Sequence, residues 1–183
     1  MPASIIMVIR HAEKPDSGNV GVQLDGSQDA DSLIVQGWQR AGALTVLFDP
    51  ARGALQSPDL AVPQFLFASK YDPTKHSKRP YETLQPLSLK LNVSINDDYK
   101  KDDYAKMAAA AMGCDGAVLV AWQHEDIPAI GKIILGDGGT VPQKWPGDRF
   151  DLVWVFTAQS GGGYSFVQVP QLLLAGDQAT LIS

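Results

Sequence analysis

Short apolar runs without polar alternation recur along the chain. The three clearest cover residues 4–9, 65–68 and 117–121. Runs of this kind, rich in β-branched and other large apolar residues, are typical of strands buried on both faces of a sheet. Two more apolar runs, 152–156 and 164–169, flank three glycines at 161–163. They predict a pair of strands joined by a glycine turn.

Segments with apolar residues at helical spacing lie between these runs. One starts near Ser32 and ends at Asp49-Pro50, and a second begins near Arg79. A third covers 104–111, with Asp102 or Asp103 as N-cap and Gly113 as the stop, and a fourth covers 127–135.

Buried strands that alternate with helices predict an α/β fold. We expect a three-layer sandwich, with a mostly parallel central sheet flanked by helices. Antiparallel pairing of the last two strands would make the sheet mixed. No repeat and no linker-like change of composition divides the 183 residues, so residues 1–183 are expected to form a single domain.

Composition narrows the class of protein. At 45% hydrophobic the chain can bury a sizeable core. No apolar run approaches the roughly 20 residues that span a bilayer, and no secretory signal pattern is visible. Cys114 is the only cysteine, which excludes an intrachain disulfide and fits a reducing compartment. We therefore expect a cytoplasmic protein without a membrane partner.

The net charge of -5 argues against a nucleic-acid partner, because phosphate backbones require a broad basic surface. An anionic ligand must instead meet a local cluster of cations. The densest group of basic side chains is Lys70, Lys75, His76, Lys78 and Arg79. We interpret the lysines as a solvated loop and treat Arg79 separately.

Three predicted strands end in polar residues. The first ends in Arg10-His11, the second leads through Ser69 toward Arg79, and the third is followed by Gln-His-Glu-Asp at 123–126. In open α/β sheets, ligands bind beyond the carboxyl ends of the strands. Two of the three histidines in the sequence, His11 and His124, would therefore meet at one edge, beside charged residues.

At these positions the sequence resembles the histidine phosphatase superfamily. Arg10-His11-Ala12-Glu13 is similar to its Arg-His-Gly signature, with alanine replacing glycine. Residues 33–41 resemble its Leu-x-x-x-Gly-x-x-Gln-Ala helix start. Residues 77–83 resemble the family region that carries the second phosphate-binding arginine. Residues 118–124 resemble the family region that carries the second histidine. The resemblance spans about residues 4–135 and implies a phosphoglycerate mutase-like fold.

The chemistry of these residues points the same way. Phosphoryl transfer depends on positioning and on cations more than on covalent assistance. A guanidinium group meets phosphate oxygens bidentately, which suits Arg10 and Arg79 to phosphate binding. Neutral His11 is the candidate nucleophile, through a phosphohistidine intermediate. A protonated His124 would add a donor, and Lys14 is expected to contact phosphate.

The general acid is assigned from the resemblance. In the acid phosphatase branch of the family it directly follows the second histidine, which favours Glu125. In the mutase branch it lies after the second arginine, where Asp103 is the reserve among four aspartates. If neither acts, a phosphohistidine or another good leaving group becomes the better substrate.

The predicted activity is thus a metal-independent phosphatase without a cofactor, acting on a small phosphorylated substrate or a phosphohistidine protein. A metallohydrolase is disfavoured because Arg10 would repel a divalent cation and no His-Glu-x-x-His spacing occurs. A mutase-type phosphotransferase remains an alternative, as does a silent phospholigand-binding domain that has Ala12 after the histidine. The aromatic segment 145–150 is interpreted as packing.

Overall fold

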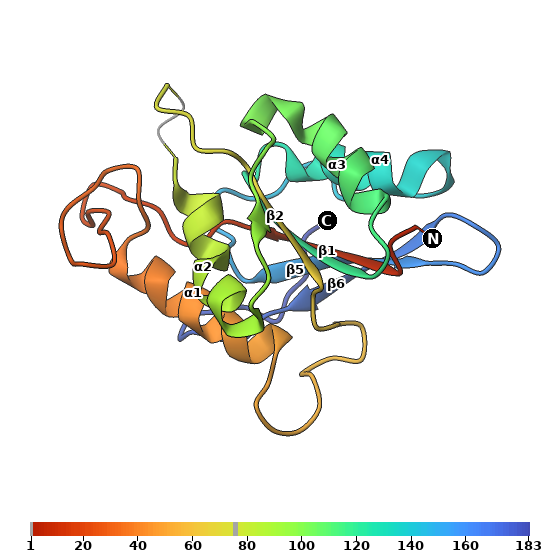
Figure 1. Cartoon of the computed structure of the whole chain (residues 1–183), viewed down its shortest axis with the longest axis horizontal. Helices are drawn as coiled ribbons and strands as arrows, with labels where there is room; N and C mark the ends of the chain where they lie inside the picture. The colour runs from red at the N-terminus through yellow and green to blue at the C-terminus, as the bar shows by residue number, and fades with distance from the viewer. Residues whose placement is uncertain (1, 75–76) are drawn as a thin grey trace.

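A computed structural model describes residues 2–74 and 77–183. Its six strands are β1 Ile5–Arg10, β2 Phe65–Ala68, β3 Ile95–Asn96, β4 Ala117–Trp122, β5 Leu152–Ala158 and β6 Tyr164–Pro170. They form one sheet in the order β3-β2-β4-β1-β5-β6 (Figure 1). The sequence predicted five of these strands; the two-residue β3 carries too short a pattern to be recognised.

The sheet is mixed, so the expectation of a mostly parallel sheet was wrong. β1, β2, β3 and β4 pair in parallel, whereas β5 pairs antiparallel with both β1 and β6. Hydrophobic runs identify buried strands without giving the direction in which each one crosses the sheet. The hairpin between β5 and β6 was expected, and its turn uses Gly162 and Gly163 at positive φ.

Four α-helices accompany the sheet: α1 Val35–Phe48, α2 Arg79–Leu91, α3 Tyr104–Met112 and α4 Ile127–Leu135. All four lie where the apolar spacing predicted them. Asp103 occupies the N-cap position of α3 and Gly113 its C-cap position, as predicted, but the Asp103 side chain makes no capping hydrogen bond. A short 3-10 turn precedes the helix, and the Asp103 carboxylate pairs with Lys106 at 2.7 Å instead. None of the described helices is long and apolar enough to cross a membrane.

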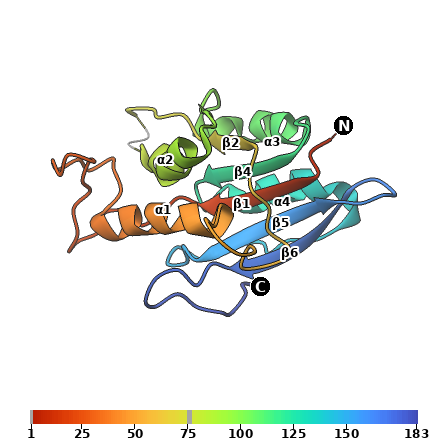
Figure 2. The same cartoon turned by 60° about the horizontal axis from the view of Figure 1, so that its bottom comes forward.

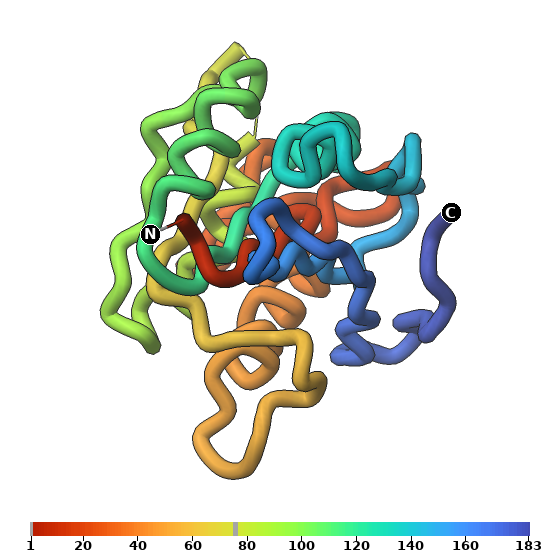
Figure 3. The backbone as a smooth tube through the Cα atoms, turned by 90° about the vertical axis from the view of Figure 1, so that its right-hand side faces the viewer, coloured from red at the N-terminus to blue at the C-terminus, as the bar shows by residue number. Residues whose placement is uncertain are grey.

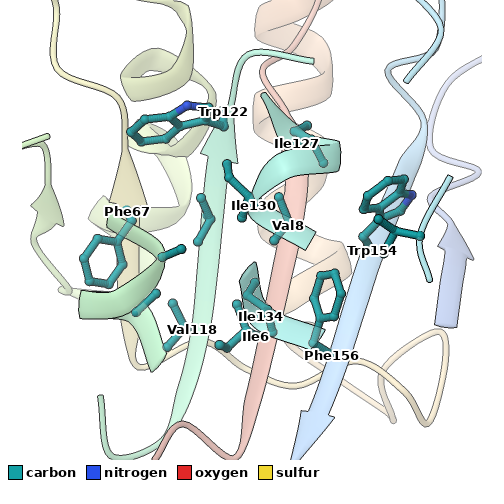
Figure 4. Close-up of a cluster of buried hydrophobic side chains, with 14 of the residues drawn as sticks. Ile6, Val8, Phe67, Val118, Trp122, Ile127, Ile130, Ile134, Trp154 and Phe156 are labelled. Atoms are coloured by element: carbon teal, nitrogen blue, oxygen red, sulfur yellow. The ribbon is translucent and has the colours of Figure 1, made fainter. Parts of the chain in front are cut away.

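Each face of the sheet packs against its own pair of helices. Ile6 and Val8 of β1 join a cluster with α3 and α4, which Figure 4 shows around Trp122 and Trp154. Met7 and Ile9, which point to the opposite face, pack with α1 and α2. Figure 2 shows the strands between these helices. The alternation along β1 follows from the pleat, and burial on both faces explains why its sequence is continuously apolar.

The segment after β6 packs back onto the domain through buried arginines. Arg40 of α1 donates to Gln171 and Asp177 of this segment and to Glu13 after β1. Arg149 donates to Thr180 O. Figure 3 shows the segment as a separate trace that ends at the C-terminus. One guanidinium group therefore connects the end of the chain to the loop that begins at His11.

Helix α1 packs closely against this same loop. The Ile34 N–H donates to Glu13 O at 3.2 Å, and a Cβ placed on Gly37 would lie 2.6 Å from that oxygen. The residue at this position therefore has to be glycine. The contact explains the glycine of the motif at 33–41 by close approach of a helix to a backbone.

We expect Gly37→Ala to destabilise the protein by about 1 to 3 kcal/mol, because overpacking must displace either α1 or the Glu13 backbone. Gly42→Ala is the matched control in the same helix. A Cβ there meets nothing within 4 Å, and alanine should stabilise the helix by about 0.5 to 1 kcal/mol. Urea unfolding measures both changes, and equal effects at the two positions would contradict the packing argument.

Candidate active site

The polar ends of β1 and β4 lie side by side at one edge of the sheet. Arg10 pairs with Trp122 in the β ladder, and the His11 N–H donates to Trp122 O at 3.0 Å. Because β5 runs antiparallel to β1, the segment that precedes β5 reaches this same edge. The edge thus gathers His11, His124 and the loop before β5.

His11 is buried, and its orientation is fixed by the backbone. Its Nδ1–H donates to Ala12 O at 2.7 Å, since a carbonyl oxygen can only accept. This tautomer leaves Nε2 with its lone pair. Burial holds the pKa of His11 well below its usual value, and the charges of Arg10, Arg79 and Lys14 lower it further. His11 is therefore a neutral imidazole at ordinary pH.

Arg10 is a buried cation that is only partly satisfied. Its Nη1 donates to Gly147 O at 2.6 Å and to Arg149 O at 3.1 Å, and its Cζ lies 3.7 Å from the centre of the Phe150 ring. Its Nε and Nη2 are buried and have no hydrogen-bond partner among the described residues. Burial lowers the pKa of Arg10 to about 10, so the group stays charged near neutral pH.

Arg79 is positioned by the first turn of α2. The Thr83 hydroxyl donates to Arg79 O at 2.7 Å and accepts the Ala12 N–H at 2.8 Å. This bridge joins the start of α2 to the residue after His11. The Arg79 Nη1 donates to Asp31 O at 3.3 Å. Its charge lowers the pKa of both His11 and Arg10, which places the three groups in one electrostatic neighbourhood.

His124 and Glu125 follow β4 and interact with each other. The His124 Nδ1 lies 3.3 Å from Glu125 Oε2, and Lys101 Nζ lies 3.6 Å from the same oxygen. Burial is the largest cause of a lowered pKa at His124, with Arg10 second. Desolvation raises the pKa of Glu125, but a backbone N–H and the charges of His124 and Lys101 outweigh it and lower the pKa.

Of the remaining residues that the sequence singled out, some lie beside the histidines and others are paired with neighbouring side chains. Lys14 is exposed, and its charge acts on both His11 and His124. Ser69, at the end of β2, accepts a hydrogen bond from the Gln123 side chain at 2.8 Å. Lys78 pairs with Asp29, away from the histidines. Asp103 pairs with Lys106 at 2.7 Å. Lys75 and His76 lie outside the described residues.

The sequence interpretation assigned the segment 145–150, which we call the roof loop, to packing and did not place it beside the histidines. Its carbonyls hold Arg10, Phe150 stacks on the same guanidinium, and a Cβ on Gly147 would lie 3.7 Å from His124 Nε2. Trp145 anchors the loop by donating to Arg149 O at 2.9 Å and packing on Trp154. The signal in the sequence that could have indicated this loop is a pair of aromatic residues around Pro-Gly-Asp, directly before a buried strand.

A cavity of about 280 Å³ lies beside this centre, lined by Glu13, Asp148, Phe150 and part of the C-terminal segment. Glu13 itself is engaged, because its Oε1 accepts from Arg40 at 2.8 Å. Across the two described stretches, no group of three or more His, Cys, Asp or Glu side chains is arranged to hold a metal ion.

Comparison with solved structures identifies the fold. The SixA phosphohistidine phosphatase bound to tungstate is 13% identical, with a TM-score of 0.58 over 91% of this chain and 97% of its own. For the putative SixA of Agrobacterium tumefaciens the identity is 16%, the TM-score 0.53 and the coverages 90% and 97%. A mycobacterial glucosyl-3-phosphoglycerate phosphatase in complex with inorganic phosphate is 14% identical, with a TM-score of 0.51 over 91% of this chain and 95% of its own.

No family model matches the sequence, and no curated protein matches it either. The structural matches nevertheless cover nine-tenths of the chain. They show that the chain shares the fold of these phosphatases, which is the fold that the resemblance of the four sequence motifs implied.

The depressed pKa of His11 predicts an acid-dependent loss of stability. The unfolded chain binds a proton at this histidine below about pH 6.5, whereas the folded chain does so only at lower pH. The free energy of unfolding should therefore fall as the pH drops below about 6.5, by up to about 1.4 kcal/mol per pH unit. Above that pH the contribution of His11 to stability does not change.

Urea unfolding at pH 7.5 and pH 5.5 tests this prediction. Between these two pH values the wild type should lose about 1 kcal/mol more stability than His11→Asn, which cannot take up the proton. Parallel losses in the two proteins would mean that His11 titrates normally in the folded state.

Proposed function

We propose that this chain is a phosphatase that transfers a phosphoryl group to His11 Nε2 and then to water. One observation carries the proposal: a charged, buried Arg10 leaves its Nε–Nη2 edge unpaired, next to a neutral histidine whose Nε2 carries the lone pair. An unpaired buried cation is costly, and a bidentate phosphate would satisfy both donors at once.

The first step forms a bond from His11 Nε2 to phosphorus while the bond from phosphorus to the leaving group breaks. The ring then carries positive charge, which the Nδ1–H shares with the Ala12 carbonyl. Water next attacks phosphorus, the P–N bond breaks, and inorganic phosphate leaves with His11 restored. Neither step needs a metal, because the cations of the site can stabilise charge on the transferring group.

Arg79, His124 and Lys14 are assigned to the same phosphate. Support for Arg79 comes from its influence on the pKa values of both His11 and Arg10. Lys14 and His124 lie in the same electrostatic neighbourhood. A dianionic phosphate would raise the pKa of His124 by favouring the imidazolium, so His124 can become a donor when substrate binds.

Glu125 is proposed as the general acid for leaving groups that need a proton. It is foremost among the carboxylates that raise the pKa of Arg10, which supports its place beside the phosphate centre. Its own pKa is lowered in the free protein, so it is ionised at neutral pH. Phosphate binding would draw His124 away from Glu125 and add negative charge nearby, and both effects raise the Glu125 pKa.

Substrates with good leaving groups are therefore favoured over alkyl phosphates, and phosphohistidine is one of them. The fold shared with proteins described as phosphohistidine phosphatases supports this class. The SixA protein is described in complex with tungstate, and the mycobacterial phosphatase in complex with inorganic phosphate. Tetrahedral oxyanions are thus the natural probes for this site.

We expect His11→Asn to abolish turnover and to eliminate the phosphoenzyme that rapid quench traps from wild type in excess chelator. The trapped species should be labile to acid and stable to alkali, as a P–N bond requires. A silent binding domain would instead bind phosphate and form no phosphoenzyme in either protein. A phosphoenzyme that persists in His11→Asn would move the nucleophile to another residue.

Glu125→Gln should slow hydrolysis of an alkyl phosphate by roughly 100-fold to 10,000-fold, the usual range for loss of general acid catalysis. A nitrophenyl phosphate, whose leaving group departs without a proton, should be affected much less. Asp103→Asn is the matched control and should leave both rates unchanged, because its carboxylate serves Lys106 at the surface. Equal losses on the two substrates, or none, would remove Glu125 from this role.

A further inference from the structure

The roof loop, residues 145–150, holds the guanidinium of Arg10 from two directions. Its Nη1 donates to the carbonyls of Pro146, Gly147 and Arg149 at 3.4, 2.6 and 3.1 Å. The Arg10 Cζ also lies over the Phe150 ring, 3.7 Å from the ring centre. The guanidinium is therefore held both through one nitrogen and by contact with an aromatic ring.

The loop that makes these contacts is itself anchored. The Trp145 side chain is buried in the core and donates to Arg149 O, and the Arg149 N–H donates to Pro146 O at 3.2 Å. The Arg149 guanidinium donates to Asp151 at 2.7 Å and to Thr180 O at 2.8 Å. Phe150 therefore extends from a fixed backbone, and its ring has a defined place above Arg10.

We propose that Phe150 is a positioning residue that orients Arg10 for bidentate phosphate binding. With Nη1 committed to the roof loop, the Nε–Nη2 edge is the part of the group left to meet phosphate oxygens. Bidentate binding depends on the plane of the fork, and a stacked ring fixes that plane. The inference rests on the proposed function, because it assigns Arg10 to phosphate.

Phe150 also lines the cavity of about 280 Å³ that contains Glu13 and Asp148. The charges of both carboxylates raise the pKa of Arg10, so they act on the same guanidinium that the ring contacts.

A double-mutant cycle on phosphate binding tests the proposal. Phe150→Leu keeps an apolar side chain but loses the ring face, and it should weaken binding of inorganic phosphate by about 3-fold to 30-fold. Phe150→Tyr retains the face and should stay close to wild type. In the Arg10→Met background, where no guanidinium remains to be oriented, Phe150→Leu should change affinity less than 2-fold.

Two further measurements separate positioning from folding. Phe65→Leu, the same substitution at the start of β2, is the control and should leave phosphate affinity unchanged. Low-temperature 15N NMR should show distinct Nη resonances for Arg10 in the wild type, because the group is held. These resonances should merge in Phe150→Leu, because the group is no longer held. The thermal midpoint of unfolding shows whether the variant keeps its fold.

The outcomes are distinguishable. Equal weakening by Phe150→Leu in both backgrounds, or no weakening in either, would overturn the positioning role. Unmerged Arg10 resonances in Phe150→Leu would overturn it as well. Unchanged phosphate affinity in Arg10→Met would instead reject Arg10 as a phosphate ligand, and with it the proposed function.

Discussion

Burial of the Arg10 guanidinium at the end of β1 is the constraint on which the candidate site depends. A charge removed from water needs partners, and the roof loop provides them for one nitrogen only. The remaining donors stay unpaired beside His11. In the proposed function these donors bind phosphate, and their place in the folded protein is the preorganisation that electrostatic catalysis requires.

Elements distant in sequence converge on the few residues that follow β1. Thr83 of α2 holds the Ala12 N–H, Gly37 of α1 packs on the Glu13 backbone, and Arg40 joins the Glu13 carboxylate to the C-terminal segment. Alanine after the histidine fits here, because the Ala12 side chain is buried beside Leu33 and Ala41. Alanine in place of the glycine of the Arg-His-Gly signature is therefore accommodated in the loop that follows His11.

The ionic state of the site also follows from this arrangement. Burial and neighbouring cations keep His11 neutral, whereas a backbone N–H and the charges of His124 and Lys101 stabilise Glu125 as a carboxylate. Under the proposed mechanism the nucleophile is ready in the free protein, but the proton donor is not. In that mechanism the charge of the substrate creates the donor, so the leaving group influences which compounds are hydrolysed.

The buried strands, the helices and the two polar strand ends with His11 and His124 can all be predicted from the amino-acid sequence. These are local patterns, set by burial and by spacing along a single element. The antiparallel pairing of β5 with β1 becomes known only from the folded chain. That direction carries the loop before β5 to the edge occupied by Arg10 and makes Phe150 part of the site. Contacts between residues 140 positions apart depend on chain direction, which hydrophobic periodicity does not encode.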